Sequence, residues 1–339
     1  MMLQQLKNYA YYDESTRQYY ASNLWTQLIE KIDPEKSRKF LSEFNNKIPL
    51  DVMVKYTQDK FLRKREQRWI LENYNDFDPA VKEQLQSLLT DYGQLDAQPI
   101  PDKADFVLFL GSSTANLCKR AFFLYDAIVK ENKKINAVIV LGNSEPYDNY
   151  LDTLQKIISL YPTYFCHGLL PKDVPLKATM HETMMFILDH LNWSEGTKPS
   201  LVELCLNHPC NTHDEVIAVL NYLPGAIEQP NARRIGLFSS AAPAKKIVVA
   251  LSHQPFNDRQ GITTLGAFLK SNQGAQFTIN AAGPGLETYH LLNALPASTT
   301  SSAQIIDNLT RTLYEISQNS QLLLCPTSTD VNEYSLSSI

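Results

Sequence analysis

The amino-acid sequence predicts an α/β protein, a Rossmann-like three-layer sandwich with a mostly parallel sheet, preceded by an all-helical N-terminal region. Two observations lead to this prediction. After residue 104, short apolar runs alternate with amphipathic segments of helix length, a pattern typical of βαβ units whose sheet is covered on both faces. Before about residue 96, apolar residues recur instead at the spacing of helices.

The predicted helices of the N-terminal region, residues 1–98, rest on periodicity and on start signals. Apolar residues recur at helical spacing through 15–32. Asp-Pro pairs at 33–34 and 78–79 are typical of an N-cap followed by proline in the first helical turn. The proline-containing stretch 94–103 then reads as a short linker to the next domain.

The Rossmann-like domain is predicted to span 104–325, with its strands at continuous apolar runs that end in small or polar residues. An amphipathic helix is expected at 115–130, directly after the first of these runs. Residues 326–339, rich in Ser and Thr, are expected to form a flexible tail. The expected strands are 106–110, 137–141, 201–206, 234–238 and, more weakly, 276–280.

The composition of the chain bears on its binding partners and on its cellular compartment. The chain has 339 residues, 44% of them hydrophobic, and a net charge of −5, which gives no reason to expect a nucleic-acid partner. A basic run at 60–68 fits the polar side of an amphipathic helix better than a phosphate-binding patch. No apolar stretch reaches the roughly 20 residues needed to span a bilayer. An N-terminus without a signal-peptide core, and an odd count of 5 cysteines, point to the cytoplasm, with export by a signal-independent route left open.

A ligand site is expected beyond the carboxyl ends of the strands, because parallel strands bring all their following loops to one edge of the sheet. These loops are rich in Gly, Ser, Thr and Asn, which suit a phosphate, a carboxylate or a ribose near helix N-termini. The alternative is that they contain only the usual turn formers and N-caps. The loops are Gly111–Thr114, Gly142–Pro146, Asn207–Asp214, Ser239–Pro243 and Gly283–Gly285.

The residues expected to form this pocket lie just after a strand or at the start of a helix. Their charge is mixed, since the acids Glu182 and Asp214 are set against Lys245 and Lys246, which favours a zwitterionic or ribose-bearing ligand over a polyphosphate. The candidate ligand-binding residues are Gly111, Ser112, Ser113, Gly142, Asn143, Glu182, Asn211, Thr212, Asp214, Ser239, Ser240 and Lys246.

Known catalytic and metal-binding fingerprints are not matched. The turn that follows Leu110 is neither G-x-G-x-x-G nor a P-loop, and no G-x-S-x-G elbow is present. The cluster Cys205, His208, Cys210 and His213 has metal-ligand residue types, but its spacing fits no common zinc module, so no metal site is predicted.

Five short motifs follow one another between about residues 104 and 250. They are Ala104-Asp-Phe-Val-Leu-Phe-Leu-Gly111, Val138-Ile-Val-Leu-Gly142, His181-Glu182-Thr-Met-Met, Asn211-Thr212-His-Asp214-Glu215, and Ile235-Gly-Leu-Phe-Ser239-Ser240 followed by Lys245 and Lys246. In the order and spacing of these motifs, the chain resembles the YdcF/SanA/ElyC-like family (domain of unknown function 218), and it is most similar to the soluble YdcF branch. Two of its turns depart from the family pattern: Gly111-Ser112-Ser113 replaces a glycine-rich turn, and Asp214-Glu215 replaces an E-N pair.

The resemblance implies a Rossmann-like fold and a small nucleotide-like ligand, with S-adenosylmethionine as the leading candidate, and it implies no particular reaction. Two other functions stay open. One is a regulatory or protein-interaction module with a degenerate pocket, whose protein partner would contact residues 1–98 through aromatic side chains, Trp25, Trp69 and the tyrosines at 11, 12, 19 and 20. The other is a hydrolase of a phosphorylated substrate, for which Glu182, Asp214 and Glu215 are the candidate general bases.

Overall fold

The computed structural model describes residues 6–45, 47–62, 77–147, 150–206, 212–227, 245–271, 276–295 and 302–320. The chain divides into two units, one made of Ala97–Thr299 and the other of Met1–Asp96 together with Thr300–Ile339. The first holds a large sheet and is called the Rossmann-like unit below. The second is called the terminal unit.

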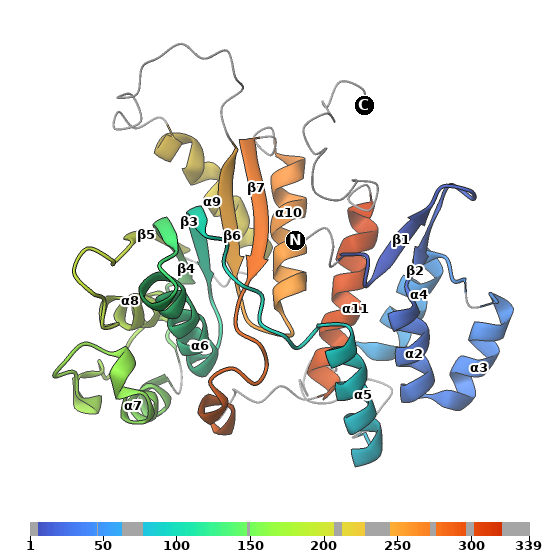
Figure 1. Ribbon diagram of the computed structural model, residues 1–339, viewed down its shortest axis with the longest axis horizontal. Coiled ribbons are helices and arrows are strands. Elements are labelled where there is room, and N and C mark those ends of the chain that lie inside the picture. The colour runs from blue at the N-terminus through green and yellow to red at the C-terminus, as the bar shows by residue number, and fades with distance from the viewer. Residues whose placement is uncertain are drawn as a thin grey trace, which may run out of the picture. The chain divides into compact units, whose positions relative to one another are not determined.

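The Rossmann-like unit is built on a five-stranded sheet in which every neighbouring pair is parallel (Figure 1). Its spatial order is β5-β4-β3-β6-β7, so the chain starts in the middle, moves to one edge, and then returns to build the other side. Counted within the unit this is the order 3-2-1-4-5, which is typical of a doubly wound α/β sheet. The strands are β3 (Lys103–Leu110), β4 (Lys134–Asn143), β5 (Ser200–Leu206), β6 (Lys246–Leu251) and β7 (Phe277–Ala282).

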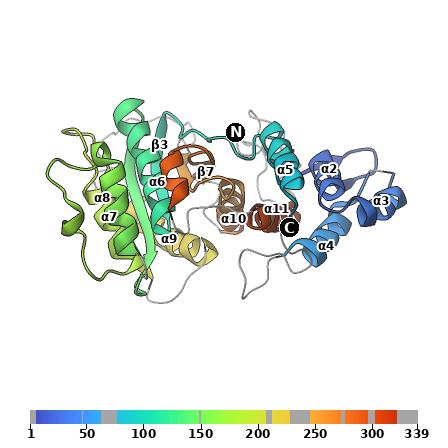
Figure 2. The same cartoon turned by 90° about the horizontal axis from the view of Figure 1, so that it is seen from below.

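Both faces of this sheet are covered by helices, which explains why its central strands are apolar on both sides. Val107 and Phe109 face a core shared with α6, α7 and α8, whereas Leu108 and Leu110 face a core shared with α9 and α10. Figure 2 shows these two groups of helices on opposite sides of the sheet. The predicted sandwich with a parallel sheet is therefore confirmed.

The helices of the Rossmann-like unit follow the strands as βαβ connections. The amphipathic helix expected at 115–130 is present as α6, and its last turn widens into the π-helical turn η1. The segments are α6 (Thr114–Tyr125), η1 (Asp126–Lys130), α7 (Tyr150–Leu160), η2 (Pro162–Tyr164), η3 (Pro171–Asp173), α8 (Met180–Asp189), α9 (Thr212–Ile227), α10 (Asn257–Lys270) and η6 (His290–Ala294).

One observed strand was not predicted. The sheet's fourth strand along the chain is β6, at Lys246–Leu251, which the sequence analysis did not identify. The run 234–238, predicted as that strand, lies outside the described residues. The sequence Lys-Ile-Val-Val-Ala-Leu is itself a continuous apolar run after its first residue, so the signal for β6 was available.

The terminal unit contains five helices among its described residues, and two of them begin as predicted. Asp33 caps α3 by accepting a hydrogen bond from the Lys36 backbone N–H at 3.1 Å, and Asp78 caps α5 through the Ala80 N–H at 2.8 Å. In both cases proline occupies the first turn, where its missing N–H costs nothing. The helices are α2 (Asn23–Ile32), α3 (Pro34–Glu43), α4 (Leu50–Phe61), α5 (Pro79–Asp91) and α11 (Ser302–Gln318).

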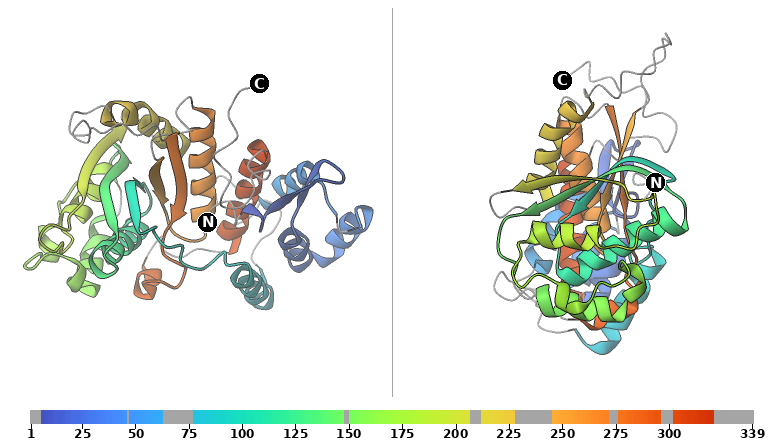
Figure 3. Two further views of the ribbon diagram at one scale, coloured as in Figure 1. Left: turned by 45° about the horizontal axis from the view of Figure 1, so that its top comes forward. Right: turned by 90° about the vertical axis from the view of Figure 1, so that its left-hand side faces the viewer.

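The expectation that residues 1–98 are entirely helical is wrong. An antiparallel hairpin, β1 (Ala10–Asp13) and β2 (Gln18–Ala21), precedes α2 and is drawn as the two blue arrows in Figure 3. Its tyrosines pair across the strands, with ring centroids of Tyr12 and Tyr19 5.0 Å apart. Tyrosine favours strands, and cross-strand aromatic pairs stabilise hairpins, so this local chemistry outweighs the helical spacing expected from residue 15 onward.

The C-terminal boundary of the Rossmann-like domain also differs from the expected 104–325. Helix α11 belongs to the terminal unit, where it packs against α4. The predicted tail, 326–339, lies outside the described residues. None of the helices in the described part of the chain is long and apolar enough to cross a membrane.

Candidate functional site

The sheet reverses its winding direction between β3 and β6, and polar side chains gather at the carboxyl ends of these two strands. Helix α6 leaves β3 toward one face of the sheet, and α10 leaves β6 toward the other. Ligands of doubly wound proteins bind at such a reversal because the two departing loops leave a crevice between them. The residues described next come from these two loops, from the first two turns of α6 and from the first turn of α10, and they are called the polar cluster.

Arg120 is the centre of the polar cluster. Its side chain is 1% exposed and extends from α6 to both strand ends. It donates to the carbonyl oxygens of Leu110 at 2.6 Å and Gly111 at 3.2 Å, to Ser252 Oγ at 3.3 Å, and to His253 Nδ1 at 3.0 Å. Burial lowers the pKa of the guanidinium to about 10, so it stays charged at neutral pH. Arg120 thus joins the ends of β3 and β6 through its hydrogen bonds.

Four further side chains of the polar cluster are buried with polar atoms that have no hydrogen-bond partner among the described residues. They are the Oδ1 of Asn116, the Nε2 of His253, and both amide atoms of Gln254 and of Asn257. Asn257 is 0% and Gln254 1% exposed. A buried amide without partners costs about 1–3 kcal/mol, and native proteins keep few of them. Their concentration at the switch point therefore indicates a place where water or a ligand completes the hydrogen bonds.

A close backbone approach shapes the same region. Gly283, just after β7, lies so near the β6–α10 loop that a Cβ there would be 2.7 Å from the Ser252 carbonyl carbon and 2.6 Å from Asn257 Oδ1. The Gly283 N–H and carbonyl both pair with Gln98, each at 2.9 Å. Glycine is needed here because no side chain fits. The missing Cβ lets the segment after β7 lie against both the β6–α10 loop and the segment around Gln98.

The segment that follows β7 is held against the polar cluster. The Gln254 backbone N–H donates to the Pro284 carbonyl at 3.0 Å, and Lys119, on α6, donates to Asn293 Oδ1. Burial lowers the pKa of Lys119 to about 8, which leaves the amine mostly protonated at neutral pH. The polar cluster is thus closed on one side by 284–293.

His253 gives the polar cluster a testable dependence of stability on pH. Burial first, and the charges of Arg120 and Lys119 second, hold the pKa of His253 well below its usual value of 6.5. Since the unfolded chain binds a proton there near pH 6.5 and the folded chain does not, the free energy of unfolding should decrease as the pH falls below 6.5. The expected slope is about 1.4 kcal/mol per pH unit until the lowered pKa is reached.

Urea unfolding of the wild type and of His253→Gln, between about pH 7.5 and 5, measures this slope. The variant should lose less stability in acid than the wild type, because glutamine does not titrate. Equal losses in the two proteins would contradict the assignment of a neutral buried imidazole.

The structure places some of the predicted site residues at this edge. Gly111 directly follows β3, and a Cβ there would lie 3.2 Å from Glu215 Oε1 and 2.7 Å from Met180 Sδ. The Ser112 carbonyl accepts a hydrogen bond from the Tyr147 hydroxyl, and Ser113 is the N-cap residue of α6. The first strand, its turn and the buried Glu215 of α9 therefore do come together.

Other predicted residues have a structural explanation. Gly142 lets α8 approach β4, because a Cβ there would be 2.8 Å from the His181 Cα. Glu182 forms a capping box with Thr179: its Oε2 accepts from the Thr179 N–H at 2.7 Å, and its own N–H donates to Thr179 Oγ1 at 3.1 Å. These bonds lower the pKa of the exposed Glu182 carboxyl. Asn143 likewise accepts from the Glu145 N–H at 3.3 Å, within the turn after β4.

The remaining predicted residues are spread more widely. Thr212 and Asp214 lie in the first turn of α9, and Thr212 Oγ1 accepts a bond from Gln260 at 3.5 Å. The expectation that Lys246 lines the pocket is wrong: it begins β6, at the opposite edge of the sheet, and its Nζ lies 3.1 Å from Asp105. The error arises because β6 was not predicted, so Lys246 was assigned to a loop. Asn211, Ser239 and Ser240 lie outside the described residues.

Sequence reasoning missed most of the polar cluster, because its key loop follows β6. With β6 placed at 246–251, the residues Ser-His-Gln that follow it would have been read as a βα loop at the carboxyl edge. Arg120 and Asn116 had a weaker signal. They are four residues apart in an amphipathic helix and so share one face, which in this case points to the strand ends.

Neither the Cys and His cluster around residue 208 nor Trp25 contributes described side chains to the polar cluster. Within the described residues there is no group of three or more His, Cys, Asp or Glu side chains that could hold a metal ion, while His208 and Cys210 lie outside them. Trp25, considered for a protein interface, is 0% exposed and packs in the core of the terminal unit.

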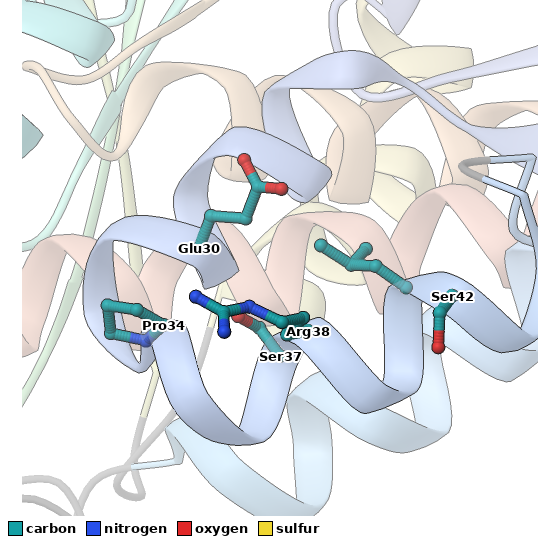
Figure 4. Close-up of a pocket in the computed structure, with 6 residues that line it drawn as sticks. Glu30, Pro34, Ser37, Arg38 and Ser42 are labelled. Atoms are coloured by element: carbon teal, nitrogen blue, oxygen red, sulfur yellow. The ribbon is translucent and has the colours of Figure 1, made fainter.

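Two surface hollows are lined by residues outside the polar cluster. One, of about 380 Å³, lies between α2 and α3 in the terminal unit and is shown in Figure 4. Figure 4 labels Glu30, Pro34, Ser37, Arg38 and Ser42 around it. The other, of about 450 Å³, is lined by Asp152, Gln155, Lys156, Ser159, Leu160, Pro171 and Leu295.

The fold and the polar cluster together define an α/β protein with a Rossmann-like unit and buried polar groups at its switch point. No protein-family model matches this chain, and neither a curated protein nor a solved structure is significantly similar to it. Membership of the YdcF-like family therefore stays a prediction from the motifs.

Proposed function

We propose that the chain binds a small polar molecule at the polar cluster, between the carboxyl ends of β3 and β6. The observation that supports this most directly is the group of buried amide and imidazole atoms without partners, contributed by Asn116, His253, Gln254 and Asn257. A folded protein tolerates such atoms where a bound molecule satisfies them. Their position at the reversal of a doubly wound sheet is where ligands of this architecture bind.

The class of ligand follows from the groups around the polar cluster. Amides offer both donors and acceptors, Arg120 and Lys119 contribute positive charge, and Glu215 contributes a carboxylate next to Gly111. This mixture suits a nucleotide-like molecule, with S-adenosylmethionine, the candidate that the YdcF-like resemblance implies, among those to test.

The alternatives receive less support from the geometry. For a hydrolase, Glu182 is unsuitable as a general base, because its carboxylate caps α8 and its pKa is lowered by those bonds. Glu215 is the better placed of the carboxylates. For a protein-interaction module, the burial of Trp25 removes one of the aromatic residues on which that hypothesis relied.

Asn116→Ala tests the proposal with little risk to the fold. Its Oδ1 has no partner among the described residues, so the melting temperature should barely change, whereas ligand affinity should fall about 3- to 10-fold, the loss of one hydrogen bond. A thermal-shift screen over nucleotides, S-adenosylmethionine and sugar phosphates identifies the ligand first. A compound at 100 times its Kd should stabilise the fold by about 2.7 kcal/mol.

Asn136→Ala is the matched control, since Asn136 is exposed near the opposite end of β4, where its Nδ2 contacts Asp105 at 3.4 Å. This variant should bind as tightly as the wild type. If no compound of the three classes shifts the melting temperature, or if both variants bind equally well, the site is not where we propose it.

A further inference from the structure

The hydrogen bonds around His253 determine which of its ring nitrogens carries the proton. Arg120 Nε and Nη2 lie 3.2 and 3.0 Å from His253 Nδ1. A guanidinium only donates hydrogen bonds, so Nδ1 must accept and cannot carry a proton. A neutral imidazole then carries its proton on Nε2.

The proton on Nε2 has no acceptor among the described residues. His253 Nε2 is buried and without a hydrogen-bond partner in that part of the chain, and the whole residue is 4% exposed. Arg120 already directs its N–H groups at Leu110, Gly111, Ser252 and His253 Nδ1. Arg120 therefore fixes the imidazole through Nδ1. The donor left for a bound molecule is the Nε2–H.

The electrostatic surroundings favour an anionic acceptor at this donor. Arg120 and Lys119 both act on the imidazole with positive charge, and Glu215 acts on Arg120 with negative charge. Helix α6 adds the positive end of its dipole. Its first turn contains no acidic residue. Arg120 links His253 to the carbonyl oxygens of Leu110 and Gly111, at the end of β3 that precedes α6.

We propose that His253 binds the ligand as a neutral hydrogen-bond donor, through Nε2–H, to an oxygen of an anionic group, a carboxylate or a phosphate. This rests on the proposed function, because it names the chemical group that the polar cluster recognises. His253 is then a binding residue that does not accept a proton from the ligand, and Arg120 is the positioning residue that fixes its tautomer.

Nitrogen-15 NMR of the histidine side chains tests the tautomer directly. The chain has 7 histidines, and the signals missing from His253→Gln assign the ring of His253. We expect a protonated Nε2 and an unprotonated Nδ1, unchanged between about pH 8 and 6, since the imidazole stays neutral. An unprotonated Nε2, or a doubly protonated ring near pH 6.5, would overturn the proposal.

Inorganic phosphate and acetate are the binding probes. Titration of either should move the Nε2–H resonance of His253 to saturation, while His181, which pairs with Glu203 at 3.1 Å, serves as an internal reference. A response to phosphate alone assigns a phosphate ligand, and a response to acetate alone assigns a carboxylate. If neither anion moves the resonance, the proposal is wrong.

Two variants test whether His253 contributes to binding through its N–H donor. His253→Gln keeps an N–H donor and should hold its affinity for the responding anion within about threefold, whereas His253→Leu should lose about 10- to 100-fold, as for a hydrogen bond to an ionised group. Equal affinities of the two variants would contradict a donor role. A compound from the thermal-shift screen that binds without any change at His253 would leave the proposed function intact and overturn this inference alone.

Discussion

Replacing Arg120 by methionine should destabilise the Rossmann-like unit by about 3–5 kcal/mol. The guanidinium donates to four buried acceptors, the carbonyls of Leu110 and Gly111, Ser252 Oγ and His253 Nδ1. Methionine fills a similar volume but donates nothing, and each buried acceptor left without a donor costs about 1–3 kcal/mol. Urea unfolding followed by circular dichroism measures the loss.

Removal of a buried charge can also stabilise a protein. Burying a charge is expensive, and replacing a buried ion by an apolar side chain stabilises some proteins by about 1–4 kcal/mol. We expect destabilisation here because the four acceptors remain behind when only the donor is removed. Lys198→Met is the control, since Lys198 forms an exposed ion pair with Asp189 at 2.9 Å. Its loss should cost less than about 1 kcal/mol. An Arg120→Met protein as stable as this control would show that the hydrogen bonds of Arg120 contribute little.

Much of the Rossmann-like fold could be predicted because its signals are local. A run such as Val107–Leu110 is apolar at every position only if both faces of the strand are buried, so it indicates a central parallel strand. The Asp-Pro pairs at the starts of α3 and α5 are also local signals, because the capping hydrogen bonds of these aspartates lie within one helical turn. The N-terminal hairpin was missed because its four-residue strands are stabilised by tyrosine pairs across the turn, and helical periodicity does not detect them.

The site was harder to predict because it depends on long-range contacts. Gly111 and Ser112 were identified from their place after a strand, which is a local property. Arg120 and His253 are 133 positions apart, and no pattern in the sequence shows that one donates to the other. Glu182 shows the converse, because its local signal, an acid at the third position of a helix, matches a capping box as well as a catalytic motif. Only the hydrogen bonds to Thr179 distinguish the two.

Gly283→Ala should destabilise the Rossmann-like unit by more than about 3 kcal/mol. The new Cβ would be 2.7 Å from the Ser252 carbonyl carbon and would also overlap the Ser252 carbonyl oxygen. These are backbone atoms at the end of β6, so they cannot rotate away as a flexible side chain could. Relief requires β7 to move from β6, which would break the Gln98 pairing and displace Asn257 from the polar cluster.

Gly168→Ala is the matched control, because its Cβ would meet no atom within 4 Å, although its φ of +92° disfavours any side chain. That variant should lose only about 1–2 kcal/mol, the cost of a left-handed residue. Melting temperatures and the binding of the compound found in the thermal-shift screen should be measured for both. We expect Gly283→Ala to lose stability and binding together, and Gly168→Ala to lose some stability and keep its affinity. If Gly283→Ala is as stable as Gly168→Ala, the ends of β6 and β7 are not as tightly packed as described.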